Sequence, residues 1–269
     1  MYKAVFLDLD GTLLDDKKNI SQENYDAIEY VTKNNGLVII CSGRSISSTQ
    51  KIWNKIKASK YIIYSNGAGI YDIHKNENIF SSSIDKDICL NLYNYSIQKN
   101  ICIRFDTPYG RYITDMKFST STDILFNENI NKFLNENEIL QISCMNEEQN
   151  HIESCINFIN NSFNSIKIEN YYNDFYGNDK INTYVINIIN PSTSKGNAIS
   201  GLCKFLKIDI NDVIAMGDDL NDISMIKMVG LGVAMGNAKP EVKNIAKEIT
   251  TTNNDNGVAK ILREKFNFI

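Results

Sequence analysis

Carboxylate side chains in two groups are the residues of this chain best suited to chemistry. Asp8 and Asp10 stand two residues apart near the N-terminus, and Asp218, Asp219 and Asp222 form a second group far along the sequence. Oxygen ligands of this kind suit a hard cation such as Mg²⁺ better than Zn²⁺. A carboxylate pair can also divide the work of a nucleophile and a general acid/base. The two groups therefore predict a metal-assisted reaction if the fold brings them together.

Donors for phosphate oxygens occur among the same segments, in the hydroxyl, amide and cationic side chains of Thr12, Ser42, Asn66 and Lys195. A carboxylate that attacks a phosphate ester is an anion approaching an anion, so the charge must be neutralised. A divalent cation and Lys195 could do this in a site sheltered from water. Lys195 opens a predicted helix, where the helix dipole disfavours a cation. Its placement there favours a phosphate partner.

Short apolar runs that end in small or polar residues must position these side chains. The runs cover residues 4–7, 37–41, 61–64, 213–216 and 231–235. They are too short for helices and rich in Val and Ile, which predicts strands buried on both faces of a parallel sheet. Ligands of such sheets bind beyond the carboxyl ends of the strands. The residues expected at that edge are Asp8, Asp10, Thr12, Ser42, Arg44, Asn66, Asp218, Asp219 and Asp222.

Helical segments alternate with these runs. Ser21 is a good N-cap for a helix that stops near Asn35, and further helices are expected over 46–56 and 197–206 and from Pro240. Alternation of strand and helix predicts a doubly wound, Rossmann-like α/β core.

The middle of the chain has a different composition, rich in Asn and Ser. It contains candidate helices over 87–99 and 147–162 and candidate strands over 101–106 and 183–189. This stretch has the usual size of a domain. We therefore predict a core made of 1–83 and 190–269, and an inserted α/β domain at 84–189. The two would be rigid bodies with the site between them.

Six short motifs resemble those of a known family. D-L-D-G-T at 8–12, S-G-R at 42–44, S-K-G at 194–196 and G-D-D-L-N-D at 217–222 resemble, in the same order, the four motifs of the haloacid dehalogenase (HAD) superfamily. S-N-G-A at 65–68 and A-M-G-N-A at 234–238 are similar to its Cof-type branch. The insert between the second and third motifs matches the α/β cap of that branch, so the resemblance covers essentially the whole chain.

The resemblance implies a Mg²⁺-dependent phosphatase that acts on small phosphorylated metabolites, with sugar phosphates, pyridoxal phosphate and flavin-pathway phosphates as candidate substrates. It implies that Asp8 is the nucleophile, forming an aspartyl-phosphate, and that Asp10 is the acid/base. It implies that Asp8, the backbone carbonyl of Asp10 and Asp218 hold Mg²⁺, with Asp222 in support. The residues that it places at the phosphate are Thr12, Ser42, Gly43, Lys195 and Asn221. The roles of Arg44, in an ion pair or at the ligand, and of Asn237, in a turn or at the ligand, stay open.

Two other functions are compatible with part of this pattern. A phosphomutase uses the same aspartate pair and returns the phosphoryl group to its substrate; the short stretch 13–41 leaves no room for a helical cap, but an α/β-capped mutase is not excluded by spacing. A non-catalytic phosphate-binding protein is disfavoured, because binding alone has no use for Asp10.

Bulk properties exclude several other classes. The net charge is -4 with a pI near 5.3, and Lys and Arg are scattered, which argues against a nucleic-acid surface. No apolar stretch reaches the ~18 residues of a membrane span, and no signal peptide is recognisable. Six dispersed cysteines predict reduced packing residues, and two histidines argue against a zinc site. We expect a soluble, cytoplasmic protein, a monomer or weak dimer, without nucleic-acid or membrane partners.

Overall fold

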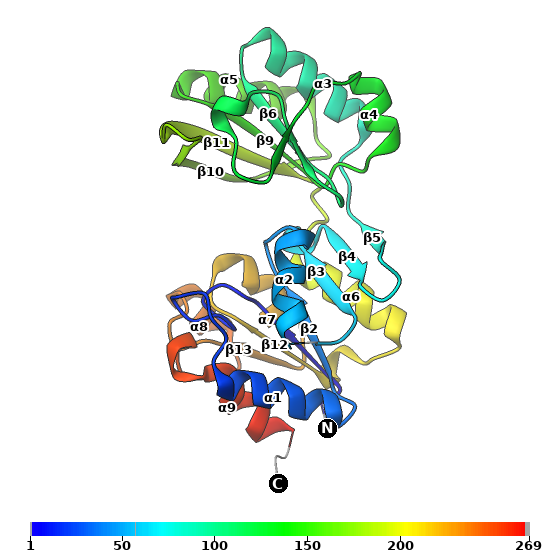
Figure 1. The fold of residues 1–269 in the computed structure, drawn as a ribbon, viewed down its shortest axis with the longest axis vertical. Helices are drawn as coiled ribbons and strands as arrows, with labels where there is room; N and C mark the ends of the chain where they lie inside the picture. The colour runs from blue at the N-terminus through cyan, green and yellow to red at the C-terminus, as the bar shows by residue number, and fades with distance from the viewer. Residues whose placement is uncertain (1, 57, 267–269) are drawn as a thin grey trace. The chain divides into compact units, whose positions relative to one another are not determined.

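The chain folds into two compact units. The computed structural model describes residues 2–56 and 58–266 (Figure 1). One unit, called the core unit here, combines Met1–Phe80 with Thr193–Ile269, and the inserted unit is Ser81–Ser192. These boundaries each lie three residues outside the predicted ones at 83/84 and 189/190.

The core unit is built on an eight-stranded sheet with the order β14-β13-β12-β1-β2-β3-β4-β5. The six strands from β14 to β3 run parallel to one another, and β4 runs antiparallel to β3. The bounds are β1 Ala4–Leu7, β2 Leu37–Cys41, β3 Tyr61–Tyr64, β4 Gly69–Asp72, β5 Glu77–Ser81, β12 Val213–Gly217, β13 Leu231–Ala234 and β14 Glu248–Ile249. All five predicted strands are present, and most of their residues are buried, as strands covered on both faces must be.

Helices cover both faces of this sheet. On one face α1 packs with α2 and α9, and on the other α6 packs with α7, which contacts α8. The bounds are α1 Gln22–Lys33, α2 Ile46–Ile56, α6 Lys195–Leu206, α7 Ile223–Met228, α8 Pro240–Ile245 and α9 Gly257–Lys265. Ser21 caps α1 through its side chain, and Pro240 opens α8. The predicted doubly wound α/β fold is thereby confirmed.

The sheet is longer than the sequence predicts because β3 continues into an antiparallel extension. A single 3₁₀ turn, Ser65–Gly67, reverses the chain between β3 and β4. Asn66 adopts φ 56° within it, a left-handed conformation that Asn tolerates better than most residues. The other 3₁₀ turns are Met116–Phe118, Ile210–Asp212, Leu220–Asp222 and Asn253–Asp255.

The inserted unit is a six-stranded sheet with three helices. Its order is β10-β11-β9-β6-β7-β8, with all neighbours antiparallel except β7 and β8. The bounds are α3 Lys86–Gln98, β6 Cys102–Asp106, β7 Arg111–Ile113, β8 Asp123–Leu125, α4 Ile130–Glu136, β9 Gln141–Asn146, α5 Gln149–Ser162, β10 Lys167–Tyr176 and β11 Ile181–Ile189. The helices lie together on one side of the sheet (Figure 1).

The two faces of the inserted sheet differ in chemistry. Residues such as Ile103, Phe105 and Ile142 form one buried cluster with the three helices. Because side chains alternate along a strand, Arg104 and Ser143 lie on the opposite face. That face combines a small apolar cluster with buried polar side chains.

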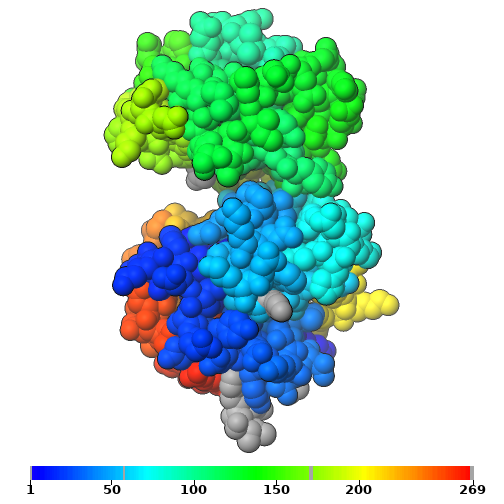
Figure 2. Space-filling view, viewed as in Figure 1, coloured from blue at the N-terminus to red at the C-terminus, as the bar shows by residue number. Residues whose placement is uncertain are grey.

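Segments far apart in the sequence form one surface in the core unit. The space-filling view shows the N-terminal residues in blue against the C-terminal residues in orange and red (Figure 2). Asn253 donates to the carbonyl of Leu14 at 3.0 Å, and Asn254 donates to the carboxylate of Asp16 at 2.9 Å. The C-terminal segment therefore holds the loop that follows β1.

All six cysteines are buried and none forms a disulfide, in agreement with their prediction as packing residues. None of the helices within 2–56 and 58–266 combines the length and apolarity needed to cross a bilayer.

Candidate active site

The polar residues at the carboxyl ends of the core strands meet at one edge of the sheet. Parallel register places Leu7, the last residue of β1, beside Ile40 of β2 and Met216 of β12. Asp8 directly follows Leu7, and Ser42 lies two residues after Ile40, as the sequence predicts. The side-chain contacts of the residues at this edge determine which charged groups are paired.

Lys195 is the centre of the site. Its side chain is 0% exposed, and its Nζ donates to Oδ1 of Asp8 and to Oδ1 of Asp222, both at 2.6 Å. A buried ammonium is tolerated only when it is paired and hydrogen-bonded. The two carboxylates meet that requirement and hold the pKa of Lys195 above its usual range despite burial. Lys195 therefore stays charged and is available to neutralise a phosphate.

Three carboxylates converge beside this lysine. Oxygen atoms of Asp8, Asp218 and Asp222 all lie within 4.8 Å of one another. Burial raises the pKa of Asp8 above its ordinary value, opposed by Lys195, and burial raises the pKa of Asp218 to about 6. Crowded, buried carboxylates disfavour their own ionisation, and a divalent cation removes that penalty. The donor set therefore fits Mg²⁺.

Asp222 is predominantly a bracing residue. One oxygen accepts from Lys195, and the other accepts from the backbone N–H groups of Asp218 and Asp219 at 2.8 and 3.0 Å. These contacts are compatible with the supporting role predicted for it. Thr12, which is fully buried, donates its hydroxyl to Oδ1 of Asp218 at 2.9 Å. The contact orients Asp218, and a contact of Thr12 with phosphate stays a prediction.

The turn after Asp8 depends on a glycine. Gly11 has φ +80°, and a Cβ at this position would collide with the carboxylate of Asp218. Only glycine combines this backbone conformation with such close approach. Asn237 donates to the carbonyl of Gly11 at 2.8 Å and accepts from the N–H of Asn253 at 2.9 Å. Asn237, whose role was open, braces the turn.

Asp10 lies outside the group of three carboxylates. Arg44 holds it in a two-pronged ion pair, Nε to Oδ2 and Nη2 to Oδ1, both at 2.6 Å. Lys18 donates to Oδ1 at 2.7 Å. Hydrogen bonding to Arg44, aided by Lys18, lowers the pKa of Asp10 to about 2. The sequence left open whether Arg44 forms an ion pair or contacts the ligand. In this structure its guanidinium forms an ion pair with Asp10.

Three of the predicted phosphate contacts, Ser42, Gly43 and Asn221, lie in the segments that follow β2 and β12. The Ser42 hydroxyl accepts the N–H of Arg44 at 3.2 Å, and the Ser42 carbonyl accepts the N–H of Asn66 at 3.1 Å. Asn221 donates to the side-chain oxygen of Asn66 at 2.9 Å, and a Cβ added at Gly43 would lie 2.8 Å from that same oxygen. Ser42, Gly43 and Asn221 are thus linked through Asn66. Their contact with phosphate stays a prediction.

Lys18 contacts the site although sequence reasoning did not select it. It belongs to none of the motifs, and the loop 13–20 carries no periodic pattern. Its backbone is left-handed, with φ 63°. No sequence signal places a lysine of such a loop beside Asp10.

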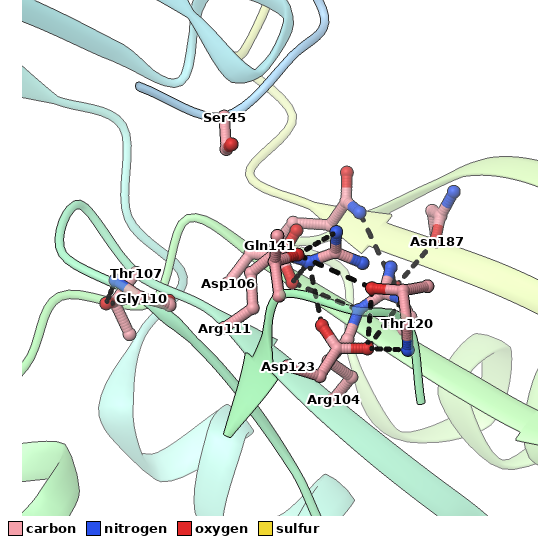
Figure 3. Close-up of polar contacts among 12 residues, drawn as sticks. Ser45, Arg104, Asp106, Thr107, Gly110, Arg111, Thr120, Asp123, Gln141 and Asn187 are labelled. Atoms are coloured by element: carbon pink, nitrogen blue, oxygen red, sulfur yellow. Dashed lines mark hydrogen bonds and ion pairs between the residues drawn. The ribbon is translucent and has the colours of Figure 1, made fainter. Parts of the chain in front are cut away.

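The inserted unit contains a polar cluster on the sheet face away from its helices (Figure 3). Arg104 lies 3.2 Å from Oδ1 of Asp106 and donates to Ser143 at 3.1 Å. Arg111 lies 3.2 Å from Asp123, whose side chain is 0% exposed. The two arginines and two aspartates make a neutral, largely buried ionic network.

Comparison with known proteins identifies the class. Residues 5–262 match the family of haloacid dehalogenase-like hydrolases, and the chain belongs to this family. It is 32% identical to the 5-amino-6-(5-phospho-D-ribitylamino)uracil phosphatase YcsE of Bacillus subtilis, over 97% of this chain and 94% of that protein. It is 29% identical to the putative phosphatase YxeH of Bacillus subtilis, over 98% of both chains.

A solved structure supports the fold. TM0651 from Thermotoga maritima superposes with a TM-score of 0.83 over 98% of this chain and 97% of that one, at 23% identity. The match covers the core unit and the insert alike. The protein is an HAD-type phosphatase that acts on phosphorylated substrates.

Proposed function

We propose that this protein hydrolyses small phosphorylated metabolites, sugar phosphates or related compounds, in a Mg²⁺-dependent reaction through an aspartyl-phosphate. The observation that carries the proposal is the Lys195 bridge between Asp8 and Asp222, with Asp218 alongside. The bridge pairs Asp8 with the Lys195 ammonium and leaves Asp218 beside it as a metal ligand. Asp10 is paired instead with Arg44 and Lys18. Asp8, the backbone carbonyl of Asp10 and Asp218 would hold the ion, with Asp222 in support, and the ion would supply charge neutralisation at the phosphoryl oxygens.

In the first half of the reaction, Asp8 attacks phosphorus in line with the leaving oxygen. The bond between Asp8 and phosphorus forms as the bond between phosphorus and the leaving oxygen breaks. Lys195 neutralises charge on the transferring group, because its ammonium is held within the buried site. Asp10 gives a proton to the leaving oxygen, so that a neutral alcohol departs.

Asp10 must therefore gain a proton before it can donate one. Arg44 and Lys18 keep it ionised in the substrate-free protein. A phosphate monoester has a second pKa near 6, so part of the substrate brings a proton with it. The negative phosphoryl group beside Asp10 also raises the proton affinity of that carboxylate.

In the second half, Asp10 acts as a base. The ionised carboxylate takes a proton from water as the water oxygen attacks phosphorus and the bond to Asp8 breaks. Phosphate leaves and the Asp8 carboxylate is restored. The two cations around Asp10 favour the ionised form that this step requires.

The substrate class rests on the chemistry of a relative. The name of YcsE, the relative that shares 32% identity, specifies a phosphorylated ribityl compound. We extend this to the present chain as a preference for phosphate esters of polyhydroxylated alcohols.

The test is phosphate release from a panel of phosphorylated metabolites. We expect turnover with Mg²⁺, loss of turnover after EDTA treatment and recovery when Mg²⁺ is restored. Asp8→Asn should abolish phosphate release while far-UV circular dichroism stays unchanged, and mass spectrometry of the quenched wild-type enzyme should map a phosphoryl adduct to the Asp8 peptide. Undiminished turnover without metal, or an adduct on another residue, would refute the mechanism.

A further inference from the structure

The two oxygens of Asp10 are not equivalent. Oδ1 accepts from Lys18 Nζ at 2.7 Å and from Arg44 Nη2 at 2.6 Å. Oδ2 accepts only from Arg44 Nε, at 2.6 Å, among the hydrogen bonds of the described residues. A carboxylate oxygen offers two lone-pair directions. Oδ1 therefore has both occupied, and Oδ2 keeps one for a further partner.

Lys18 is the source of this asymmetry. The guanidinium of Arg44 binds both oxygens with equal distances, so by itself it would leave one lone pair on each. The backbone of Arg44 is held on both sides, because its N–H donates to the Ser42 hydroxyl and its carbonyl accepts from the N–H of Ser65. The added ammonium of Lys18 fills the remaining direction on Oδ1.

Hydrogen bonds within the loop after β1 hold the backbone on either side of Lys18. The ends of the loop are tied by the N–H of Asp15 to the carbonyl of Asn19, at 2.9 Å, and by the N–H of Asn19 to the carboxylate of Asp15, at 2.7 Å. Lys18 lies between them with φ 63°, a conformation that is uncommon for a residue other than Gly, Asn or Asp. Local backbone strain of this kind is held by surrounding structure and clusters at functional sites.

We propose that Lys18 is a positioning residue for proton transfer by Asp10. By occupying Oδ1, it leaves Oδ2 as the oxygen that passes the proton to the leaving group and later takes one from water. The proposal rests on the proposed function, and it adds which oxygen of Asp10 reacts and which residue selects it. The bonds formed and broken at phosphorus stay as in the proposed mechanism. One proton leaves Oδ2 of Asp10 as the leaving oxygen departs, and one returns to Oδ2 from water.

The experiment compares Lys18→Met with the wild-type enzyme on two substrates. Methionine has a similar length but cannot donate a hydrogen bond. Lys17→Met is the matched control, because Lys17 is an exposed neighbour that forms no ion pair within the described part of the chain. Lys18→Arg tests rescue, since it keeps a cationic donor. The substrates are an alkyl phosphate, whose leaving group needs protonation, and p-nitrophenyl phosphate, whose leaving group needs little.

We expect Lys18→Met to lower kcat/KM for the alkyl phosphate about tenfold, a part of the ~10²–10⁴-fold that acid/base catalysis is worth. For p-nitrophenyl phosphate, kcat/KM should fall less than about threefold, because its first step depends less on Asp10. Lys18→Arg should recover most of the loss, and Lys17→Met should match the wild type. In an Asp8→Asn background, which binds substrate without turnover, adding Lys18→Met should leave the Kd for the alkyl phosphate unchanged.

Three results would overturn the proposal. Equal losses on both substrates would show that Lys18 does not act through proton transfer. A weaker Kd that accounts for the loss would show that Lys18 binds substrate directly. Unchanged kinetics would show that it has no role. Wild-type turnover in the same assays keeps these outcomes distinct from failure of the proposed function, which would instead appear as no phosphate release by the wild-type enzyme.

Discussion

At the scale of residues, the site separates two carboxylates that lie two positions apart in sequence. Asp8 is 8% exposed and pairs with the buried Lys195, whereas Asp10 is 41% exposed and pairs with Arg44 and Lys18. Their environments shift the two pKa values in opposite directions, upward by burial for Asp8 and downward by hydrogen bonds to Arg44 for Asp10. Opposite shifts in a carboxylate pair are a common basis for dividing catalytic roles.

We predict that Asp10→Asn lowers the rate on alkyl phosphates by about 10²–10⁴-fold, because the amide can neither donate nor accept the transferred proton in the same way. The first step on p-nitrophenyl phosphate should suffer less, since that leaving group needs little protonation. Single-turnover kinetics on both substrates measures the difference. Equal loss on both would argue against an acid role. Slow decay of the phosphoenzyme in this variant would report the loss of the base.

A second prediction concerns pH and metal affinity. Burial raises the pKa of Asp218 to about 6, and that of Asp8 is also raised. Mg²⁺ binds the ionised forms, so protons compete with it. Apparent Mg²⁺ affinity should therefore fall as the pH is lowered from about 8 to about 6, through the raised pKa values. Calorimetric titration across that range, in buffers of different ionisation enthalpy, measures both the affinity and the protons released. A pH-independent affinity without proton release would contradict the proposed ligands.

At the scale of elements, the strands of the two sheets serve different purposes. In the core, β1 and β12 are apolar throughout, and the carboxylates of the site lie in the residues that follow them. In the inserted unit, polar side chains occur within the strands, because one face of that sheet carries no helix. Arg104 is placed in the middle of β6 on this face (Figure 3).

We predict that Arg104→Met destabilises the inserted unit by about 3–5 kcal/mol. Removal of one partner from a buried ionic network leaves the remaining charges uncompensated, and Arg104 contacts Asp106 and Ser143. Urea unfolding followed by far-UV circular dichroism gives the free energy. Lys167→Met, a change at an exposed position on β10, is the control and should stay within about 0.5 kcal/mol of the wild type. A neutral Arg104→Met would show that the network does not stabilise the unit.

At the scale of the whole molecule, two units with separate hydrophobic cores share one chain. The buried apolar clusters of the core unit and of the inserted unit have no residue in common. The single tryptophan, Trp53, lies in α2 of the core unit, where its indole N–H donates to the carbonyls of Ala58 and Ser59 at 3.1 and 2.9 Å. Tryptophan fluorescence therefore reports on the core unit alone.

We predict that Mg²⁺ raises the unfolding temperature detected by Trp53 fluorescence and leaves the unfolding of the inserted unit unchanged. A ligand at about 100 times its Kd stabilises the state that binds it by about 2.7 kcal/mol. The proposed ligands all belong to the core unit. Thermal unfolding followed by fluorescence and by circular dichroism, with Mg²⁺ or EDTA, separates the two. An equal shift of both transitions would show that the units unfold cooperatively.

Most of the core could be predicted from local patterns. Strands such as β1 and β3 are short apolar runs with abrupt polar ends, and α2 follows a helical period between clear boundaries. The extension by β4 and β5 was not predicted, because β5 is half exposed and has no continuous apolar run. The strand β10 was missed for a similar reason, since it is rich in Asn, Tyr and charged residues.

The sequence by itself determined the class of chemistry. Motif order and strand-end placement brought Asp8, Asp218 and Lys195 to one edge, because parallel strands expose their carboxyl ends together. Tertiary structure alone decided which cation holds which carboxylate. Lys195 is buried between Asp8 and Asp222, whereas Lys18 reaches Asp10 from a left-handed turn. Such pairings depend on the path of non-periodic loops and on which side chains the folded chain buries next to one another. Neither leaves a repeating pattern in the sequence.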